Sequence, residues 1–277
     1  MRSLLLAAAA CIFVLSLSAC ATRPQEQAAA AKLAFSPERP MPAPDIMSFP
    51  GPRRGLAGRT IRVSKPSDIV LARGEVVLTF DDGPYPGRTR AILDTLDAYG
   101  VKATFFMVGA MAKAHPAEAR EVATRGHTIG SHTQDHRNLA SMAFDAAVED
   151  IEKGRRNIAS ATGKSVPFFR FPYLAATPAL RRQLASQGIV EVSPTVDSKD
   201  YFSSTPDQVR ARTTAALKRR GSGVILFHDI QKRTVDMLPA FLEDLKANGF
   251  SIARLAPGSS PVDAPLVAAA SPLAIPQ

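Results

Sequence analysis

Between residues 75 and 255 the sequence alternates short apolar runs with amphipathic stretches that end at or beside a glycine. The apolar runs predict buried strands at 75–80, 103–108, 127–131, 168–171, 189–195, 223–227 and 250–255. The stretches between them predict helices at 88–99, 116–126, 144–161, 178–188, 206–221 and 235–247. Such alternation is typical of a parallel sheet covered by helices. About seven of these units, without a Gly-x-Gly-x-x-Gly turn, predict an α/β fold: an irregular (β/α)7 barrel with its active site at the C-terminal strand ends.

The first of these strands ends in two adjacent carboxylates, Asp81 and Asp82, which the turn Gly83-Pro84 follows. Because an unpaired buried charge is costly, both acids are expected where the strand stops and the chain turns. There one carboxylate can bind a metal while the other takes a proton. An exposed acidic turn is the alternative that this stretch alone leaves open.

Polar clusters also follow the later strands. They are His132-Thr133-Gln134-Asp135-His136, Arg170-Phe171-Pro172-Tyr173, Asp197-Ser198-Lys199-Asp200-Tyr201 and Leu226-Phe227-His228-Asp229. One helical turn would bring His132 and His136 to the same side, and two histidines with a carboxylate leave open positions on a bound metal. Taken singly, each cluster has a structural explanation: a surface histidine pair, an ion-paired strand end or a hydrogen-bonded core histidine. Together, at the strand ends of one barrel, these clusters indicate a single site. The other two histidines are expected to lie outside it: His127 as a packed structural residue and His115 as an exposed one.

These clusters, with Thr79-Phe80-Asp81-Asp82-Gly83-Pro84, resemble in order the five motifs of the polysaccharide deacetylases, carbohydrate esterase family four. The resemblance runs from about Glu75 to Leu255. It implies metal-dependent removal of acetyl groups from N-acetylated sugars. It also implies that Asp82, His132 and His136 bind a divalent metal, commonly zinc, with cobalt, nickel or manganese as alternatives.

The resemblance further implies a catalytic role for each of the other motif residues. Asp81 would be the general base and Arg170 its partner, which keeps the carboxylate ionised. His228 would be the general acid that protonates the leaving amine, held in its protonated form by Asp200. The backbone N–H of Tyr173 would donate to the oxyanion. Leu226 and Tyr201 would form the walls of the acyl pocket.

Two positions depart from the family pattern. Tyr201 stands where the fourth motif usually ends in Trp, and the chain contains no Trp at all. Leu174 follows Pro172-Tyr173 where the family often has Gly. Tyr201 alters one wall of the acyl pocket, and Leu174 alters the loop that shapes the sugar groove, while neither touches the metal ligands or the acid and base. An O-acetyl esterase on another polysaccharide and a non-catalytic carbohydrate-binding lipoprotein are the alternatives.

The N-terminus resembles a bacterial lipoprotein signal. Arg2, an apolar stretch from Leu4 to Leu17 and the closing Leu17-Ser18-Ala19-Cys20 predict a signal peptide at 1–19 with Cys20 as the lipidated residue. A plain secretory signal with a chance Cys is the alternative. The Pro- and Ala-rich stretch 20–55 is expected to be a tether, 56–256 the catalytic domain and 257–277 a disordered tail.

Charge and cysteine content limit the partners. The net charge of +9 favours an anionic polymer or membrane surface, but no basic cluster with interleaved aromatics predicts nucleic-acid binding. Cys11 falls within the predicted signal, so the mature chain has no intramolecular disulfide. We therefore expect a monomer that is held by its lipid in the cell envelope, on the periplasmic side of the outer membrane where there is one, and that acts on an acetylated polysaccharide: peptidoglycan, poly-N-acetylglucosamine or chitin oligomers.

Overall fold

The computed structural model describes residues 55–258. The predicted signal peptide, Cys20, the tether up to residue 54 and the tail from residue 259 lie outside the described residues. Among the helices that are described, none is both long and apolar enough to cross a membrane.

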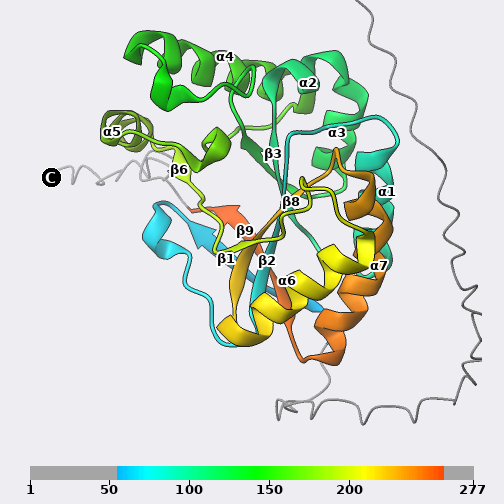
Figure 1. Ribbon diagram of the computed structural model, residues 1–277. Helices are drawn as coiled ribbons and strands as arrows, with labels where there is room; N and C mark the ends of the chain where they lie inside the picture. The colour runs from blue at the N-terminus through cyan, green and yellow to red at the C-terminus, as the bar shows by residue number, and fades with distance from the viewer. Residues whose placement is uncertain (1–54, 259–277) are drawn as a thin grey trace, which may run out of the picture. The chain divides into compact units, whose positions relative to one another are not determined.

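Parallel strands form a barrel that is nearly closed, as the alternation in the sequence predicted (Figure 1). The strands are β1 (Ala57–Val63), β2 (Glu75–Asp81), β3 (Thr104–Met107), β4 (Thr128–Ser131), β5 (Phe168–Phe169), β6 (Val190–Glu191), β7 (Val196–Asp197), β8 (Gly223–His228) and β9 (Ser251–Pro257). From β2 the sheet runs through β3, β4 and β5 to β6 on one side, and through β8 to β7 on the other. β9 pairs with the first residues of β2 and then runs along β1.

Helices lie around the outside of this sheet (Figure 1). They are α1 (Arg88–Ala98), α2 (Gly109–Ala114), α3 (Pro116–Thr124), α4 (Phe144–Thr162), α5 (Pro178–Ser186), α6 (Pro206–Arg220) and α7 (Lys232–Ala247), with short 3-10 turns η1 (Pro66–Asp68), η2 (Leu139–Ser141) and η3 (Pro172–Leu174). α6 begins with a capping box: Thr205 and Gln208 each accept the other's backbone N–H, at 3.2 and 2.9 Å.

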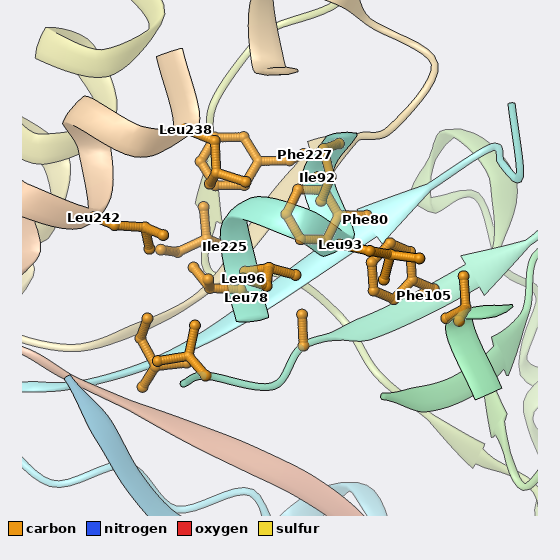
Figure 2. Close-up of a cluster of buried hydrophobic side chains, with 14 of the residues drawn as sticks. Leu78, Phe80, Ile92, Leu93, Leu96, Phe105, Ile225, Phe227, Leu238 and Leu242 are labelled. Carbon is orange, nitrogen blue, oxygen red and sulfur yellow. The ribbon is translucent and has the colours of Figure 1, made fainter. Parts of the chain in front are cut away.

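The alternation of β2 side chains explains both the core and the position of the site. Leu78 and Phe80 face outward and pack against leucines and isoleucines of α1 and α7 (Figure 2). Each such buried side chain contributes about 2 kcal/mol to stability. Val77 faces the barrel interior with Phe106 and Phe168. Because β-strand side chains alternate, Asp81 also points inward, at the C-terminal end of the barrel.

The structure differs from the sequence predictions of local structure at three places. Of the strand expected at 189–195 only β6 (Val190–Glu191) forms, and the unpredicted β7 (Val196–Asp197) follows it in a different ladder, because Pro194 between them has no N–H to donate. β1 was not predicted, since five of its seven residues are exposed and its sequence has no apolar run. His115 is half-buried rather than exposed, because it joins the end of α2 to the start of α3.

His127 is a packed structural residue, as predicted. Its ring is buried, and Nδ1 accepts a hydrogen bond of 3.1 Å from the backbone N–H of Ala103. Burial lowers the pKa of His127 to about 3, so the ring is neutral.

Candidate active site

Asp81 and Asp82 direct their carboxylates toward one place although they are neighbours in sequence. Asp82 has left the strand and adopts φ 76°, a left-handed conformation that Asp tolerates. As a result the Nε2 atom of His132 lies 3.8 Å from Asp81 Oδ2 and 3.6 Å from Asp82 Oδ1. An isolated extended strand would have placed the two carboxylates on opposite faces.

Arg170 lies against Asp81 in the barrel interior. Its Nη1 donates to Asp81 Oδ1 and to Thr79 Oγ1, both at 2.7 Å, and its Nε donates to the carbonyl of Val192 at 2.9 Å. The guanidinium stacks over the ring of Phe106, 4.3 Å from the centroid. Burial raises the pKa of Asp81, and the positive charges of Arg170 and His228 oppose that rise. The result is a desolvated carboxylate, fixed in orientation by an ion pair.

Asp82, His132 and His136 form a set of ligand atoms that all lie within 4.8 Å of one another. The Nδ1 atom of His132 is hydrogen-bonded to the carbonyl of Arg170 at 2.8 Å, which leaves Nε2 free on the side of Asp82. The Nε2 atom of His136 is 3.3 Å from Asp82 Oδ1. That oxygen is buried and has no hydrogen-bond partner among the described residues.

These three residues fit a divalent metal. Burial lowers the pKa of His132 to about 3, so its ring is neutral and Nε2 carries a lone pair. One carboxylate and two imidazoles are a set of ligands that zinc accepts, with positions left for water and substrate. The buried oxygen of Asp82 without a partner is the kind of atom that a bound cation satisfies.

A loop, not a helical turn, brings the two histidines together. Thr133 and His136 have φ of 72° and 53°, and the imidazole rings meet edge to face with centroids 4.8 Å apart. α2 holds this loop from one side, because the N–H groups of Gly109 and Ala110 donate to the carbonyls of Thr133 and Gln134 at 2.8 and 2.9 Å.

Residues of α4 also hold this loop, and the sequence analysis did not identify them. Asp150 accepts the backbone N–H of Gln134 at 3.1 Å, and Asn157 donates to the Gln134 side chain at 2.8 Å. Gly154 lies so close that a Cβ there would overlap the carbonyl of Thr133. A glycine in the middle of an otherwise regular helix was the signal that could have pointed to this close approach.

His228 lies near the Oδ2 oxygen of Asp82, whereas His132 and His136 lie near its Oδ1 oxygen. Its Nδ1 is 2.7 Å from Asp200 Oδ1, its backbone N–H donates to Asp200 Oδ2 at 2.8 Å, and Thr234 Oγ1 donates to the same oxygen at 2.5 Å. Burial alone would lower the pKa of His228, but the hydrogen bond and charge of Asp200 outweigh it and raise the pKa to about 9. The Nε2 atom of His228 points toward the site, 3.9 Å from Asp82 Oδ2.

The remaining predicted residues surround this centre. Tyr173 is exposed at φ 57°, and its ring lies edge to face with His136 at 4.9 Å between centroids. Tyr201 packs its ring edge to face with His228 at 5.4 Å and donates its hydroxyl to Asp197 Oδ2 at 2.8 Å. Leu226 is buried and pairs with Thr79 in the β2–β8 ladder. The structure thus places every predicted site residue of the described region at the C-terminal ends of the strands.

The fold and this geometry define a parallel α/β barrel that carries a candidate metal centre between the carboxylate of Asp81 and the imidazole of His228. The family model of polysaccharide deacetylases matches residues 70–192. The chain is 32% identical over 162 residues to the chitooligosaccharide deacetylase of Azorhizobium caulinodans, which is 58% of this chain and 76% of that protein. It belongs to the polysaccharide deacetylase family.

Other relatives carry peptidoglycan in their names. The chain is 30% identical over 181 residues to the peptidoglycan-N-acetylglucosamine deacetylase PgdA of Listeria monocytogenes, which is 65% of this chain but only 38% of that protein. A solved structure of a peptidoglycan deacetylase from Bdellovibrio bacteriovorus superposes with a TM-score of 0.65 at 32% identity, over 80% of this chain and 63% of that one.

Proposed function

We propose that this chain is a metal-dependent hydrolase that removes N-acetyl groups from a polysaccharide containing N-acetylglucosamine. One observation carries the proposal: the buried carboxylate of Asp81 and the cationic imidazole of His228 flank Asp82, a member of the candidate metal set. Asp81 and His228 both lie within 4 Å of members of that set. A base and an acid that flank one metal site are what the hydrolysis of an amide requires.

Asp81 is the general base of the proposed reaction, and it takes the proton from the attacking water. Its raised pKa makes it a better base, and Arg170 fixes the direction in which it accepts. A divalent metal held by Asp82, His132 and His136 would supply Lewis acidity, which lowers the pKa of water and polarises the acetyl carbonyl.

His228 is the general acid of the proposed reaction. With a pKa of about 9 it carries its proton at neutral pH. Its Nε2 gives that proton to the amide nitrogen as the C–N bond breaks, and the products are acetate and a free amine on the sugar. The backbone N–H of Tyr173 donates to the carbonyl oxygen as negative charge develops there.

Peptidoglycan is the substrate that the relatives favour, because two of the proteins compared above carry that word in their names. The Azorhizobium relative supports chitin oligomers as a second substrate. Poly-N-acetylglucosamine is the third member of the same chemical class. All three present the same N-acetyl group on a glucosamine ring.

The test is release of acetate by residues 21–277, incubated with peptidoglycan, N-acetylglucosamine oligomers and acetylated xylan. We expect release from an N-acetylated polymer, its loss with a chelator and its recovery with zinc or cobalt. An Asp81→Asn variant should keep its metal and lose nearly all turnover. Metal-loaded, folded protein that releases nothing would favour the carbohydrate-binding alternative.

A second arm separates the amidase from an O-acetyl esterase. An alkoxide leaves more easily than an amine, so amide cleavage depends more strongly on an acid. His228→Ala should therefore reduce acetate release from N-acetylated oligomers far more than release from acetylated xylan. Preferential release from xylan by the unaltered protein would favour the esterase.

We also propose that Cys20 carries lipid that anchors the mature chain in the cell envelope. The charged start, apolar core and Cys of the first 20 residues support this. Several acyl chains on one residue give stable membrane attachment. The wild-type chain should therefore be recovered with membranes and incorporate labelled palmitate, and a Cys20→Ser chain should do neither.

A further inference from the structure

Asp229 is a buried carboxylate that the proposed reaction does not use. It follows His228 at the end of β8, its side chain is almost fully buried, and no ion pair reaches it within residues 55–258. A buried carboxylate costs stability unless it is hydrogen-bonded or ion-paired, so the hydrogen bonds of Asp229 bear on its role.

The hydrogen bonds of Asp229 lead to the loop that carries Asp82. Its Oδ2 accepts from Thr89 Oγ1 at 2.6 Å, and Thr89 Oγ1 in turn accepts from the backbone N–H of Tyr85 at 2.7 Å. The backbone N–H of Asp229 donates to the carbonyl of Asp81 at 3.3 Å. One residue thus connects the end of β8 to the end of β2, to the first turn of α1 and to the loop between them.

Gly83 shows that the loop packs directly on this carboxylate. A Cβ at Gly83 would overlap both oxygens and the carboxyl carbon of Asp229. Only glycine fits at this approach, so the residue after Asp82 lies against Asp229 with no space between them.

We propose that Asp229 is a positioning residue: through Thr89 and through its packing against Gly83, it holds Asp82 at the place where the metal is bound. This inference rests on the proposed function. Asp229 does not touch the metal set itself but acts through the backbone of the loop. Removal of an outer-shell group that orients a metal ligand typically reduces metal affinity by about 10- to 100-fold.

Metal affinity of the folded protein is the readout that tests this role. Zinc binding to the mature chain is measured by competition with a chromophoric chelator, and the visible spectrum of the cobalt form reports ligand geometry. Circular dichroism and thermal unfolding show that each variant is folded. The variants are Thr89→Val, Thr89→Ser and Asp229→Ala, with Thr95→Val as the matched control. Thr95 is in the same helix, but its hydroxyl donates only to the carbonyl of Ala91.

We expect Thr89→Val and Asp229→Ala to weaken zinc binding about tenfold or more and to alter the cobalt spectrum. Thr89→Ser keeps the hydroxyl and should restore affinity, and Thr95→Val should leave affinity unchanged. Because Thr89 and Asp229 act through one chain of contacts, the double variant should be little weaker than Asp229→Ala alone.

The outcomes separate this inference from the proposed function. If Thr89→Val and Asp229→Ala are both folded and bind zinc as tightly as the wild type, the positioning role is wrong while the proposed function stands. Should Asp229→Ala not fold, Thr89→Val and its serine rescue decide alone. A wild-type chain that bound no zinc or cobalt would contradict the proposed function and this inference with it.

Discussion

Asp81 and His228 stand opposite each other in the β2–β8 ladder, and their surroundings give them different chemistry. Burial raises the pKa of Asp81 from that of an ordinary carboxyl group, while Arg170 keeps it paired. Asp200 raises the pKa of His228 to about 9 against the effect of burial. Two adjacent strand ends thus supply a carboxylate that accepts a proton and an imidazolium that donates one.

Replacing Asp200 with Asn tests this division at the level of a single charge. His228 must be protonated to act as an acid, so kcat/KM for an N-acetylated oligomer should fall as pH rises through about 9. Without the negative charge, burial lowers the pKa of His228, so the alkaline limb in Asp200→Asn should move down by at least about 2 pH units. The check is a kcat/KM profile from pH 5 to pH 10 at saturating zinc.

Asp236→Asn is the control for that profile, because Asp236 is on α7 and pairs with exposed Lys232. Its alkaline limb should coincide with that of the wild type. A limb that stays in place in Asp200→Asn would mean that another group, not His228, sets the alkaline limit.

Among the elements, α2 and α4 are responsible for the shape of the metal loop. The loop 132–136 has no regular secondary structure of its own, and two of its residues have positive φ. The carbonyls of Thr133 and Gln134 accept from Gly109 and Ala110 of α2, and the N–H of Gln134 donates to Asp150 of α4. The packing of α2 against α4 therefore determines the conformation of the loop.

Gly154→Ala should reverse the usual effect of this substitution in a helix. In an exposed helix interior, Gly→Ala stabilises by about 1 kcal/mol. Here the new Cβ would overlap the carbonyl of Thr133, so we expect a lower free energy of unfolding and a zinc affinity reduced by about tenfold. Urea unfolding and zinc competition measure the two quantities.

Ser160→Ala on the exposed side of α4 is the comparison for this variant, and it should not lower the free energy of unfolding or change zinc affinity. If Gly154→Ala proves more stable than the wild type and binds zinc normally, α4 does not determine the loop.

The sequence was sufficient for the elements whose pattern is strong and insufficient where tertiary contacts decide. β2, β3 and β8 were predicted because their apolar runs are buried on both faces, and the parallel barrel followed from their alternation with helices. The strands β1 and β7 were missed, since neither is marked by such a run. The loop at 132–136 could not be predicted, because its positive φ angles depend on groups from α2 and α4 that lie far away in sequence.

In the whole described chain, exposed large apolar side chains are concentrated around the site. Five of the seven lie on loops at the C-terminal strand ends: Tyr85, Tyr173, Leu174, Tyr201 and Phe202. Exposed apolar surface gathered in one place is typical of a binding region. Around a centre that would act on one N-acetyl group, these side chains offer apolar surface to the neighbouring sugars of a polymer.

Phe202 is the member of this group whose loss should affect binding without affecting chemistry. It is 55% exposed, its ring packs on Tyr201 with centroids 4.7 Å apart, and Arg212 fixes the backbone before it through the carbonyls of Ser198 and Lys199 at 2.8 and 3.1 Å. A rigid aromatic face can stack on a sugar ring at little entropic cost. Phe202→Ala should therefore raise KM for a long N-acetylglucosamine oligomer by about tenfold, or about 1.4 kcal/mol, with kcat unchanged.

Oligomer length makes this prediction specific to the proposed contact. A substrate too short to reach Phe202 should show no change in KM, so the effect of the variant should grow from the dimer to the longer oligomers. Val70→Ala removes another exposed apolar side chain, beside the start of β2 at the opposite end of the barrel, and should change KM for no oligomer. A fall in kcat that is the same for every length would instead mean that Phe202 supports Tyr201 and His228, and that the polymer is held elsewhere on the rim.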